Sequence, residues 1–194
     1  MDDRPHVVAI AGSLREESRS RRALEHALDA AEAAGGTTEL LDLRAFDLPM
    51  VDPDEDDPAD AVALKEAVRA ADAILLGTPV YHGSYSSPLK TALDYCGFDE
   101  FADKTVGLLA VAGGSFPITA LDHLRSVCRS LDAWVIPHQA AVTRSGSAFA
   151  DGEFVDEGLA ERVATLGRRA VQYANIEPDP ATFEGEENVG AVDR

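Results

Sequence analysis

Five apolar runs, separated by segments with helical periodicity, constrain the fold of this sequence more than any other feature. The runs are 6–11 (HVVAIA), 38–43 (TELLDL), 73–77 (AILLG), 105–112 (TVGLLAVA) and 133–137 (AWVIP). Most of them lack alternation of apolar and polar residues, which is typical of strands covered on both faces. Because each interval is long enough for a crossover helix, the sequence predicts five parallel strands in a repeated β/α pattern.

The intervals between the runs repeat apolar residues at the spacing of one helix face. These residues are Ala23, Ala27, Ala30 and Ala34; Leu64 and Val68; Leu121, Leu124 and Leu131; and Val163, Leu166, Ala170 and Val171. Helices on both faces of five parallel strands give an α/β fold, a three-layer doubly wound sandwich. Its common five-stranded version has the flavodoxin-like order 2-1-3-4-5.

The length and composition favour a single domain. The chain has 194 residues and is 45% hydrophobic, enough for one core, and we expect residues 1–176 to form that domain. Residues 177–194 are acidic and poor in large apolar side chains, which predicts a loosely held tail. The apolar runs are shorter than the roughly 18 residues that cross a bilayer, and MDDRPH is not a secretion signal. We therefore expect a cytoplasmic protein without a membrane segment.

The charge of the chain is strongly negative. The formal net charge is −18, with three lysines against fourteen arginines. This disfavours nucleic acid as a partner, because phosphate neutralisation needs clustered cations. Acid enrichment with few lysines is expected of a halophilic protein, whose salt-rich cytosol screens the repulsion. Residues 47–60 alone carry seven acids and three prolines and are expected to form a solvated surface loop.

The two cysteines, Cys96 and Cys128, are isolated in the sequence. Neither lies in a CxxC pattern or at a spacing from histidine that suggests a metal site, and one pair does not make a disulfide framework. We expect two buried thiols without a catalytic role, and no metal site.

In the predicted fold, ligands bind beyond the carboxyl ends of the strands, where the strand order reverses. The loops after the first, third and fourth strands should therefore share one site. They read GSLREESRS (12–20), TPVYHGSYSS (78–87) and GGSFP (113–117), and all three are rich in glycine and hydroxyl groups.

The first of these loops concentrates positive charge where a helix is expected to begin. Arginines at positions 15, 19, 21 and 22 lie near the start of that helix, where the helix dipole disfavours cations. A phosphate would offset this charge if it were bound by backbone N–H groups, serine hydroxyls and Arg15. The alternative is a capped helix whose arginines pair with nearby glutamates on the surface. For Arg21 and Arg22, which fall inside the helix, this alternative is favoured.

The type of phosphate ligand follows partly from motifs that the sequence lacks. Neither GxGxxG nor GxxxxGK[ST] follows the first strand, so neither a dinucleotide fold nor a nucleoside triphosphatase is indicated. Flavin mononucleotide (FMN) suits a hydroxyl-rich loop without those glycines.

The second and third loops could receive a flat ring. Pro79 begins an extended segment, Tyr81 and His82 offer flat faces, and Gly83 allows close approach of the backbone. Ser86 or Ser87 is expected to cap a helix beginning at Pro88. In the third loop, Gly113, Gly114 and Ser115 could lie against the ligand plane. Either loop could instead be an ordinary turn before a helix.

Taken together, GSLREESRS, TPVYHGSYSSPLKTALDY and AGGS resemble the NADPH-dependent FMN reductase family of flavodoxin-like flavin and quinone reductases. The likeness covers roughly residues 6–155. It implies FMN as the cofactor, with its phosphate and ring bound by Ser13, Arg15, Ser18, Ser20, Pro79, Val80, Tyr81, His82, Gly83, Ser84, Gly113, Gly114 and Ser115. Many relatives have Asn where Ser20 stands, and the residue at Val80 varies among them.

The resemblance also implies an activity and an assembly. NAD(P)H would be the co-substrate, and its hydride would pass through FMN to a small acceptor such as a flavin or quinone, in ping-pong order. No acid–base residue is nominated, and Tyr81 is the side chain expected nearest the ring. Family members are commonly homodimers or homotetramers, here with the helix 88–97 between subunits.

Two alternatives stay open in the sequence. One is a flavodoxin-type electron carrier acting on protein partners; the small residues of the second loop argue against it, because a carrier usually covers its flavin with large aromatic side chains. The other is a ligand-free module of the same fold. The sequence identifies neither the acceptor nor the choice between NADH and NADPH.

Overall fold

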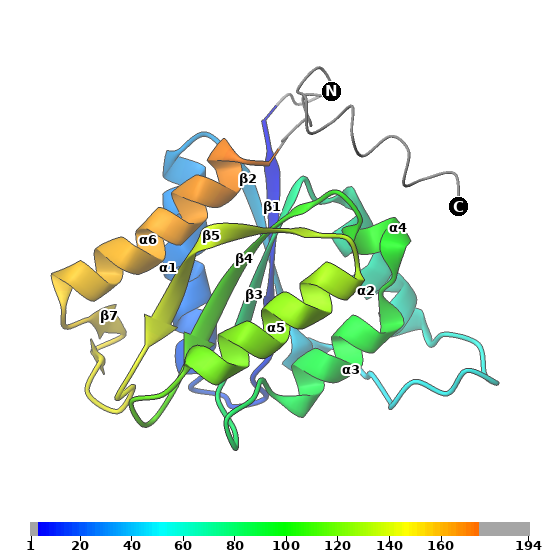
Figure 1. Cartoon of the computed structure of the whole chain (residues 1–194), viewed down its shortest axis with the longest axis horizontal. Helices are drawn as coiled ribbons and strands as arrows, with labels where there is room; N and C mark the ends of the chain where they lie inside the picture. The colour runs from blue at the N-terminus through cyan, green and yellow to red at the C-terminus, as the bar shows by residue number, and fades with distance from the viewer. Residues whose placement is uncertain (1–3, 175–194) are drawn as a thin grey trace, which may run out of the picture.

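Five parallel strands form the central sheet in the order β2-β1-β3-β4-β5 (Figure 1). The computed structural model describes residues 4–174. The strands are β1 (His6–Ala11), β2 (Thr37–Asp42), β3 (Ala73–Pro79), β4 (Thr105–Val111) and β5 (Trp134–Val142). The predicted α/β fold, its parallel sheet and its strand order are confirmed.

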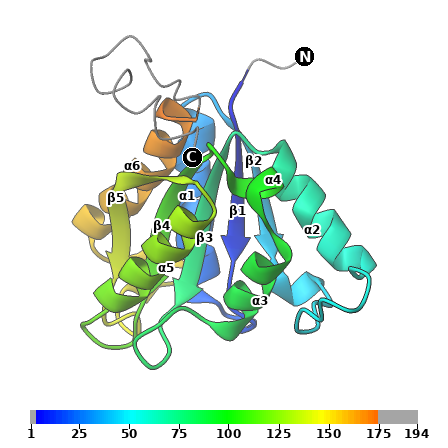
Figure 2. The same cartoon turned by 45° about the vertical axis from the view of Figure 1, so that its right-hand side comes forward.

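Helices cover both faces of this sheet and make three layers (Figure 2). They are α1 (Arg19–Ala33), α2 (Ala59–Ala70), α3 (Ser87–Tyr95), the short α4 (Phe98–Phe101), α5 (Ile118–Ser130) and α6 (Glu157–Gln172). The buried residues of α1 and α6 share one core cluster, and those of α2, α3, α4 and α5 share the other. A short 3₁₀ helix, η1 (Leu43–Ala45), follows β2. Among residues 4–174, no helix is both long and apolar enough to cross a membrane.

The central strands explain why the apolar runs do not alternate. All seven residues of β4 are buried, as are all but the last of β3 and all but the first of β1. The edge strands β2 and β5 are only partly buried. Continuous apolar runs thus belong to strands with a helix layer on each side.

The helix α1 packs closely on α6 through small residues. Ala23, Ala27 and Ala31 are fully buried there, whereas the predicted face continued through Ala30 and Ala34. That continuation was wrong, because Ala30 is half-buried and Ala34 is the exposed C-cap. At the crossing, a Cβ atom on Gly167 would lie 1.8 Å from the carbonyl oxygen of Ala27.

Several predicted element ends differ from the structure. β2 ends at Asp42 because Leu43 begins η1, and α3 ends at Tyr95 because Gly97 is the N-cap of α4. The larger error concerns β5, which was predicted to end at Pro137 but continues to Val142. β5 pairs only with β4, and its register shifts between Val106 and Leu108 of that strand. An edge strand with such an irregularity tolerates a proline.

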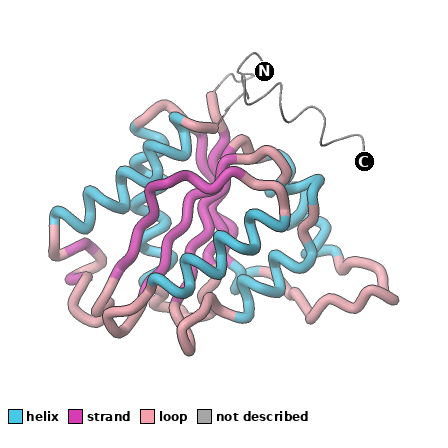
Figure 3. Tube along the Cα trace, viewed as in Figure 1, coloured by secondary structure: helices cyan, strands magenta, loops and turns pink. Residues whose placement is uncertain are grey.

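The segments outside the sheet lie on its periphery. Residues 49–57, within the predicted acidic loop, are exposed and without regular structure. Two strands of two residues each, β6 (Phe149–Ala150) and β7 (Glu153–Phe154), form a hairpin that lies against α1. The ring centroids of Phe154 and His26 are 5.2 Å apart. The predicted tail, 177–194, lies outside the described residues. In Figure 3, the loops after β1, β3, β4 and β5 gather at one end of the sheet.

Candidate functional site

A pocket of about 280 Å³ opens where these loops meet. It is built from residues at or just beyond the carboxyl ends of β1, β3, β4 and β5, where the strand order reverses between β1 and β3. Its lining residues are Ser13, Arg15, Glu17, Ser18, Arg19, Ser20, Pro79, Val80, Tyr81, Val111, Gly113 and Ser145.

The first loop places three buried hydroxyl groups on the pocket. Ser13, Ser18 and Ser20 are each at most 3% exposed. Ser18 is the N-cap of α1, and its Oγ accepts a hydrogen bond from the backbone N–H of Arg21 at 3.1 Å. The hydroxyl groups of Ser18 and Ser20 lie 3.0 Å apart, and Ser13 Oγ accepts from the N–H of Arg15. Hydroxyl groups at a helix N-terminus are suited to an anion.

Gly12 fixes the start of this loop against its neighbours. Its N–H donates to Gly77 O at 2.8 Å, and a Cβ at this position would lie 2.8 Å from the Cβ of Leu89. The carbonyl of Gly12 accepts a hydrogen bond from Ser86 Oγ. The first loop is thereby joined to β3 and to the start of α3.

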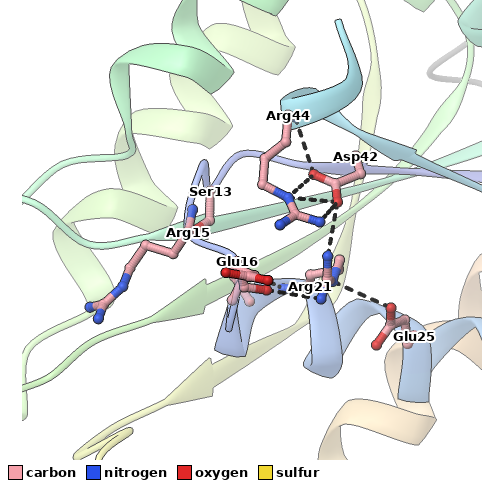
Figure 4. A network of polar contacts seen from close by, with 9 residues as sticks. Ser13, Arg15, Glu16, Arg21, Glu25, Asp42 and Arg44 are labelled. Atoms are coloured by element: carbon pink, nitrogen blue, oxygen red, sulfur yellow. Dashed lines mark hydrogen bonds and ion pairs between the residues drawn. The ribbon is translucent and has the colours of Figure 1, made fainter.

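The arginines of the first loop fall into two groups (Figure 4). Arg21 is paired: its guanidinium donates to Asp42 Oδ2 and to the carbonyl of Glu16, each at 3.0 Å, and lies 3.5 Å from Glu25. Arg15 extends away from that network. Within residues 4–174, neither Arg15 nor Arg19 forms an ion pair or a side-chain hydrogen bond. The surface-pair interpretation thus holds for Arg21 and fails for the two arginines that line the pocket. It also fails for Arg22, for which it was favoured, because the side chain of Arg22 has no carboxylate partner within residues 4–174 and lines another cavity.

Asp42 anchors the paired group at the end of β2. Burial alone would raise the pKa of Asp42, but hydrogen bonds from Arg44 and Arg21 lower it below its ordinary value. The carboxylate therefore stays ionised and holds Arg21 against the first loop.

The second loop is a tight turn that rests on α5. Tyr81 and Ser84 exchange two backbone hydrogen bonds of 3.0 Å, with His82 at φ 50° and Gly83 at φ 77°. Ser84 Oγ lies 2.9 Å from Nδ1 of His123 in α5. The side chain of Tyr81 is 49% exposed, so part of its ring is free to contact a ligand.

The third loop leaves open space beside the pocket. Gly113, Gly114 and Ser115 are exposed, and Cβ atoms on either glycine would meet nothing within 4 Å. A flat group can therefore come close to this backbone.

The chain matches a known protein family over most of its length. The sequence profile of the family described as NADPH-dependent FMN reductase matches residues 5–147. The chain belongs to this family. The family that the three loops predicted is confirmed.

Individual relatives agree with this assignment. The FMN-dependent NADPH-azoreductase of Staphylococcus aureus is 41% identical over 118 residues, which are 59% of this chain and 63% of that protein. The chain thus spans less than two thirds of the length of this curated relative. FerB of Paracoccus denitrificans, a flavoenzyme NAD(P)H:(acceptor) oxidoreductase, has a TM-score of 0.74 at 23% identity, over 88% of this chain and 97% of its own. The apo form of the NADH:FMN oxidoreductase EmoB has a TM-score of 0.72 at 23% identity, over 90% and 92%. The two structures show the fold.

In this FMN reductase family member, the pocket gathers eight of the predicted site residues. They are Ser13, Arg15, Ser18, Ser20, Pro79, Val80, Tyr81 and Gly113. The other five are not part of its lining: His82, Gly83 and Ser84 belong to the turn that rests on α5, and Gly114 and Ser115 lie beside the pocket on the exposed third loop. Their contacts with a cofactor stay predictions.

Sequence reasoning missed four lining residues: Glu17, Arg19, Val111 and Ser145. Arg19 was noted for its charge but not assigned to the site. Ser145 lies in the loop TRSGS (143–147), which resembles the other three loops in composition. That signal was overlooked because β5 was predicted to end at Pro137, five residues before its end at Val142.

The pocket fits the phosphate of FMN better than it fits the whole molecule. Three buried hydroxyl groups, the first N–H groups of α1 and two unpaired arginines suit a dianion. Pockets that enclose a whole ligand measure roughly 300 to 1,000 Å³, and this pocket, of about 280 Å³, lies just below that range. The ring would therefore extend over the open wall formed by Val80, Tyr81 and Gly113.

A larger cavity, of about 480 Å³, lies between α1 and the β6–β7 hairpin. Five carboxylates line it against one arginine, Arg22. This balance of charge disfavours a phosphate group there.

Neither cysteine belongs to the site. Cys96 and Cys128 are buried free thiols, and burial raises the pKa of each to about 12. Both stay protonated, and the prediction that both are buried is confirmed. Within the described part of the chain, no three His, Cys, Asp or Glu side chains are grouped to hold a metal ion.

Proposed function

We propose that this protein is an FMN-dependent NAD(P)H oxidoreductase that passes hydride from nicotinamide through FMN to a small acceptor. One observation carries the proposal: three buried serines and two arginines without a side-chain partner in residues 4–174 surround the N-terminus of α1, beside an open wall suited to a flat ring. Family membership and the names of the relatives, which describe NAD(P)H-dependent flavoenzymes, favour an enzyme over an electron carrier.

The residues of the first loop would hold the cofactor. We assign its phosphate to Ser13, Arg15, Ser18 and Ser20, and we add Arg19 because it lines the same pocket without a partner. When bound, FMN supplies the group that accepts and returns hydride. The protein binds this group and orients the second substrate against it.

The ring would lie on the second and third loops. Residues Pro79 to Ser84 form one wall, with Tyr81 as the nearest side chain, and Gly113 to Ser115 form the other. The turn conformation of His82 and Gly83 fixes the backbone N–H and C=O groups of the first wall. No side chain needs to transfer a proton in this arrangement.

The acceptor is proposed as a small molecule with a flat conjugated system, such as a free flavin, a quinone or an azo compound. The azo compound enters from the name of the relative in Staphylococcus aureus. The half-exposed ring of Tyr81 and the open glycines leave room for such a molecule.

The decisive experiment mixes purified protein with FMN and NADPH in high salt and follows absorbance at 340 nm. Each acceptor class is added separately under nitrogen, and oxygen is tested alone. We expect NADPH oxidation that requires FMN and increases with at least one acceptor. Bound flavin without oxidation of either NADPH or NADH would contradict the proposal and favour the electron carrier.

We further propose a homodimer or homotetramer formed through α3 (Ser87–Tyr95), the helix that the sequence predicted at 88–97. An apolar groove of about 320 Å³ lies beside the start of this helix, lined in part by Leu14, Phe46, Met50 and Pro88. Met50 is 86% exposed, which costs free energy unless another surface covers it. Light scattering of the wild type and of Thr91→Glu, which places a charge in the groove, tests this: a wild-type monomer would refute it.

We also propose that the protein works in a salt-rich cytoplasm. The net charge of −18 and the near absence of lysine support this setting. Strong screening is needed to keep such a surface from repelling itself.

A further inference from the structure

A fourth loop, 143–147, contributes Ser145 to the lining of the site. It follows β5 and lies next to the third loop, because Ser145 N–H donates to Ala112 O at 3.0 Å. Ser145 is 5% exposed and lines the pocket. Its neighbour Arg144 is exposed and does not line the pocket. Arg144 therefore lies on the rim, outside the space assigned to the FMN phosphate.

The backbone of Arg144 is held in an unusual conformation. Its φ is 47°, in the left-handed region that arginine rarely adopts. Its N–H donates to Gly114 O at 2.9 Å, and its carbonyl accepts from the N–H of Ser147 at 3.0 Å and from Ser147 Oγ at 3.2 Å. Strained backbone persists where surrounding contacts enforce it, and it is concentrated at binding sites. These contacts hold the backbone from which the Arg144 side chain extends in a defined conformation.

The guanidinium of Arg144 has no carboxylate partner anywhere in residues 4–174. Arg22, Arg129, Arg162 and Arg169 also have no carboxylate partner there, so the position of Arg144 next to the pocket-lining Ser145 matters more than the missing partner. The whole chain has 35 acidic residues against 17 basic ones. The loops after β1, β3, β4 and β5 reverse that balance, since they carry three arginines against two glutamates. Positive charge is kept at this end of the sheet, where an anionic substrate would otherwise be repelled.

Arg15 and Arg144 lie on opposite sides of the site. β1 and β5 are separated by β3 and β4, so their loops begin roughly 14 Å apart at the usual strand spacing. Arg15 and Arg19 line the pocket and Arg144 does not. The arrangement provides for two anionic groups.

We propose that Arg144 binds a phosphate of the second substrate, which docks over Gly113 to Ser115. This phosphate belongs either to the nicotinamide dinucleotide or to a flavin nucleotide that serves as the acceptor. The inference rests on the proposed function, because it assigns Arg144 to the substrate that follows FMN into the site.

The test compares the wild type with Arg144→Asn and Arg144→Lys. Asn tolerates left-handed backbone, so the loop is expected to keep its conformation, and Lys keeps the charge. Arg129→Asn is the matched control, because Arg129 is exposed at the end of α5 and is also without a partner in the described part of the chain.

Kinetics with pairs of substrates locate the phosphate. For Arg144→Asn we expect KM to rise about tenfold or more, with partial recovery in Arg144→Lys. A rise for NADPH alone assigns Arg144 to the 2′-phosphate, and an equal rise for NADPH and NADH assigns it to the diphosphate. A rise for FMN but not riboflavin as the acceptor assigns it to the acceptor. Unchanged KM values for every substrate would overturn the proposal.

Binding measurements separate this inference from the proposed function. Calorimetric titration of FMN into the apoprotein should give the same Kd for the wild type and Arg144→Asn; a weaker Kd would place Arg144 at the cofactor and overturn the proposal. NADP⁺, NAD⁺ and additional FMN are then titrated into the FMN-loaded proteins. If the wild type binds FMN but does not turn over, the proposed function fails, and these titrations alone decide whether Arg144 binds a second phosphate.

Discussion

Neighbouring arginines of the first loop differ in what surrounds them. Arg21 is held by Asp42, Glu25 and the carbonyl of Glu16, whereas Arg15 and Arg19 face the pocket without partners. The sequence correctly predicted the pairing of Arg21, which falls inside a helix. It wrongly predicted the same for Arg22, whose side chain has no carboxylate partner in residues 4–174. It could not predict that Arg19 would face the pocket, since this depends on the angle at which the chain enters α1.

Replacing Arg15 by Ala should weaken FMN binding. Loss of a charge-assisted hydrogen bond to phosphate costs on the order of 1.5 to 3 kcal/mol. Quenching of flavin fluorescence measures the Kd, and Arg22→Ala is the control because Arg22 lines the other cavity. An equal Kd for Arg15→Ala and the wild type would refute the assignment of Arg15 to phosphate.

Replacing Asp42 by Asn should lower stability in a pH-dependent way. The pKa of Asp42 is lowered in the folded protein, so the carboxylate contributes stability above its unfolded pKa, about 3.9. That contribution is lost as the pH falls through the folded pKa. At pH 7 we expect Asp42→Asn to lower the free energy of unfolding by about 1 kcal/mol.

Urea unfolding at pH 7 and at pH 3 to 4 measures this effect. The difference from the wild type should shrink at the lower pH. Asp99→Asn is the control, since the side chain of Asp99 is 86% exposed and 3.9 Å from Arg69, and it should have little effect. A difference that stays constant with pH would contradict the role assigned to the Asp42 carboxylate.

Among the elements, the contact between α1 and α6 depends on the absence of side chains. Gly167 approaches the backbone of Ala27 so closely that a Cβ would lie 1.8 Å from its carbonyl oxygen. Backbone atoms cannot give way as a flexible side chain can. The alanines that indicated a helix in the sequence thus also set how closely the two helices pack.

Replacing Gly167 by Ala should destabilise the protein by about 3 kcal/mol or more, because α6 must move away from α1. Thermal and urea unfolding measure the loss. Gly158→Ala, on the exposed first turn of α6, is the control and should change stability by less than about 1 kcal/mol. If both variants unfold alike, the close contact does not determine the packing of the two helices.

Element boundaries show how far the sequence could be interpreted. The central strands were predicted because burial on both faces requires continuous apolar runs. The end of β5 was not, because Pro137 and the polar residues after it resemble the end of a strand. An edge strand tolerates both, since one side of it has no neighbour. The same error hid Ser145 and Arg144, which lie beyond the true end of the strand.

For the whole molecule, net charge is the dominant electrostatic feature. A charge of −18 on 194 residues opposes the compact state through self-repulsion. Ion pairs do not change this net charge, because the chain has 35 acidic residues against 17 basic ones and the excess acids have no cation to pair with.

Salt should therefore stabilise the protein. Raising KCl from about 0.1 M to 1 M shortens the Debye length from about 10 Å to 3 Å. We expect the Tm to rise by several degrees over this range, and by less for an equal further addition. Differential scanning calorimetry measures this Tm. A constant or falling Tm would show that charge repulsion does not limit stability.

The hydroxyl group of Ser86 connects α3, the proposed subunit interface, to the first loop, the proposed site of the FMN phosphate. It caps α3 by accepting a hydrogen bond from Leu89 N–H, and it donates one to the carbonyl of Gly12 at the start of the first loop. A shift of α3 on association would be transmitted to Gly12 through this hydrogen bond and through the close contact with Leu89. Subunit contact and cofactor binding would then be thermodynamically linked, each changing the affinity of the other by the same factor. The affinity for flavin would then depend on protein concentration.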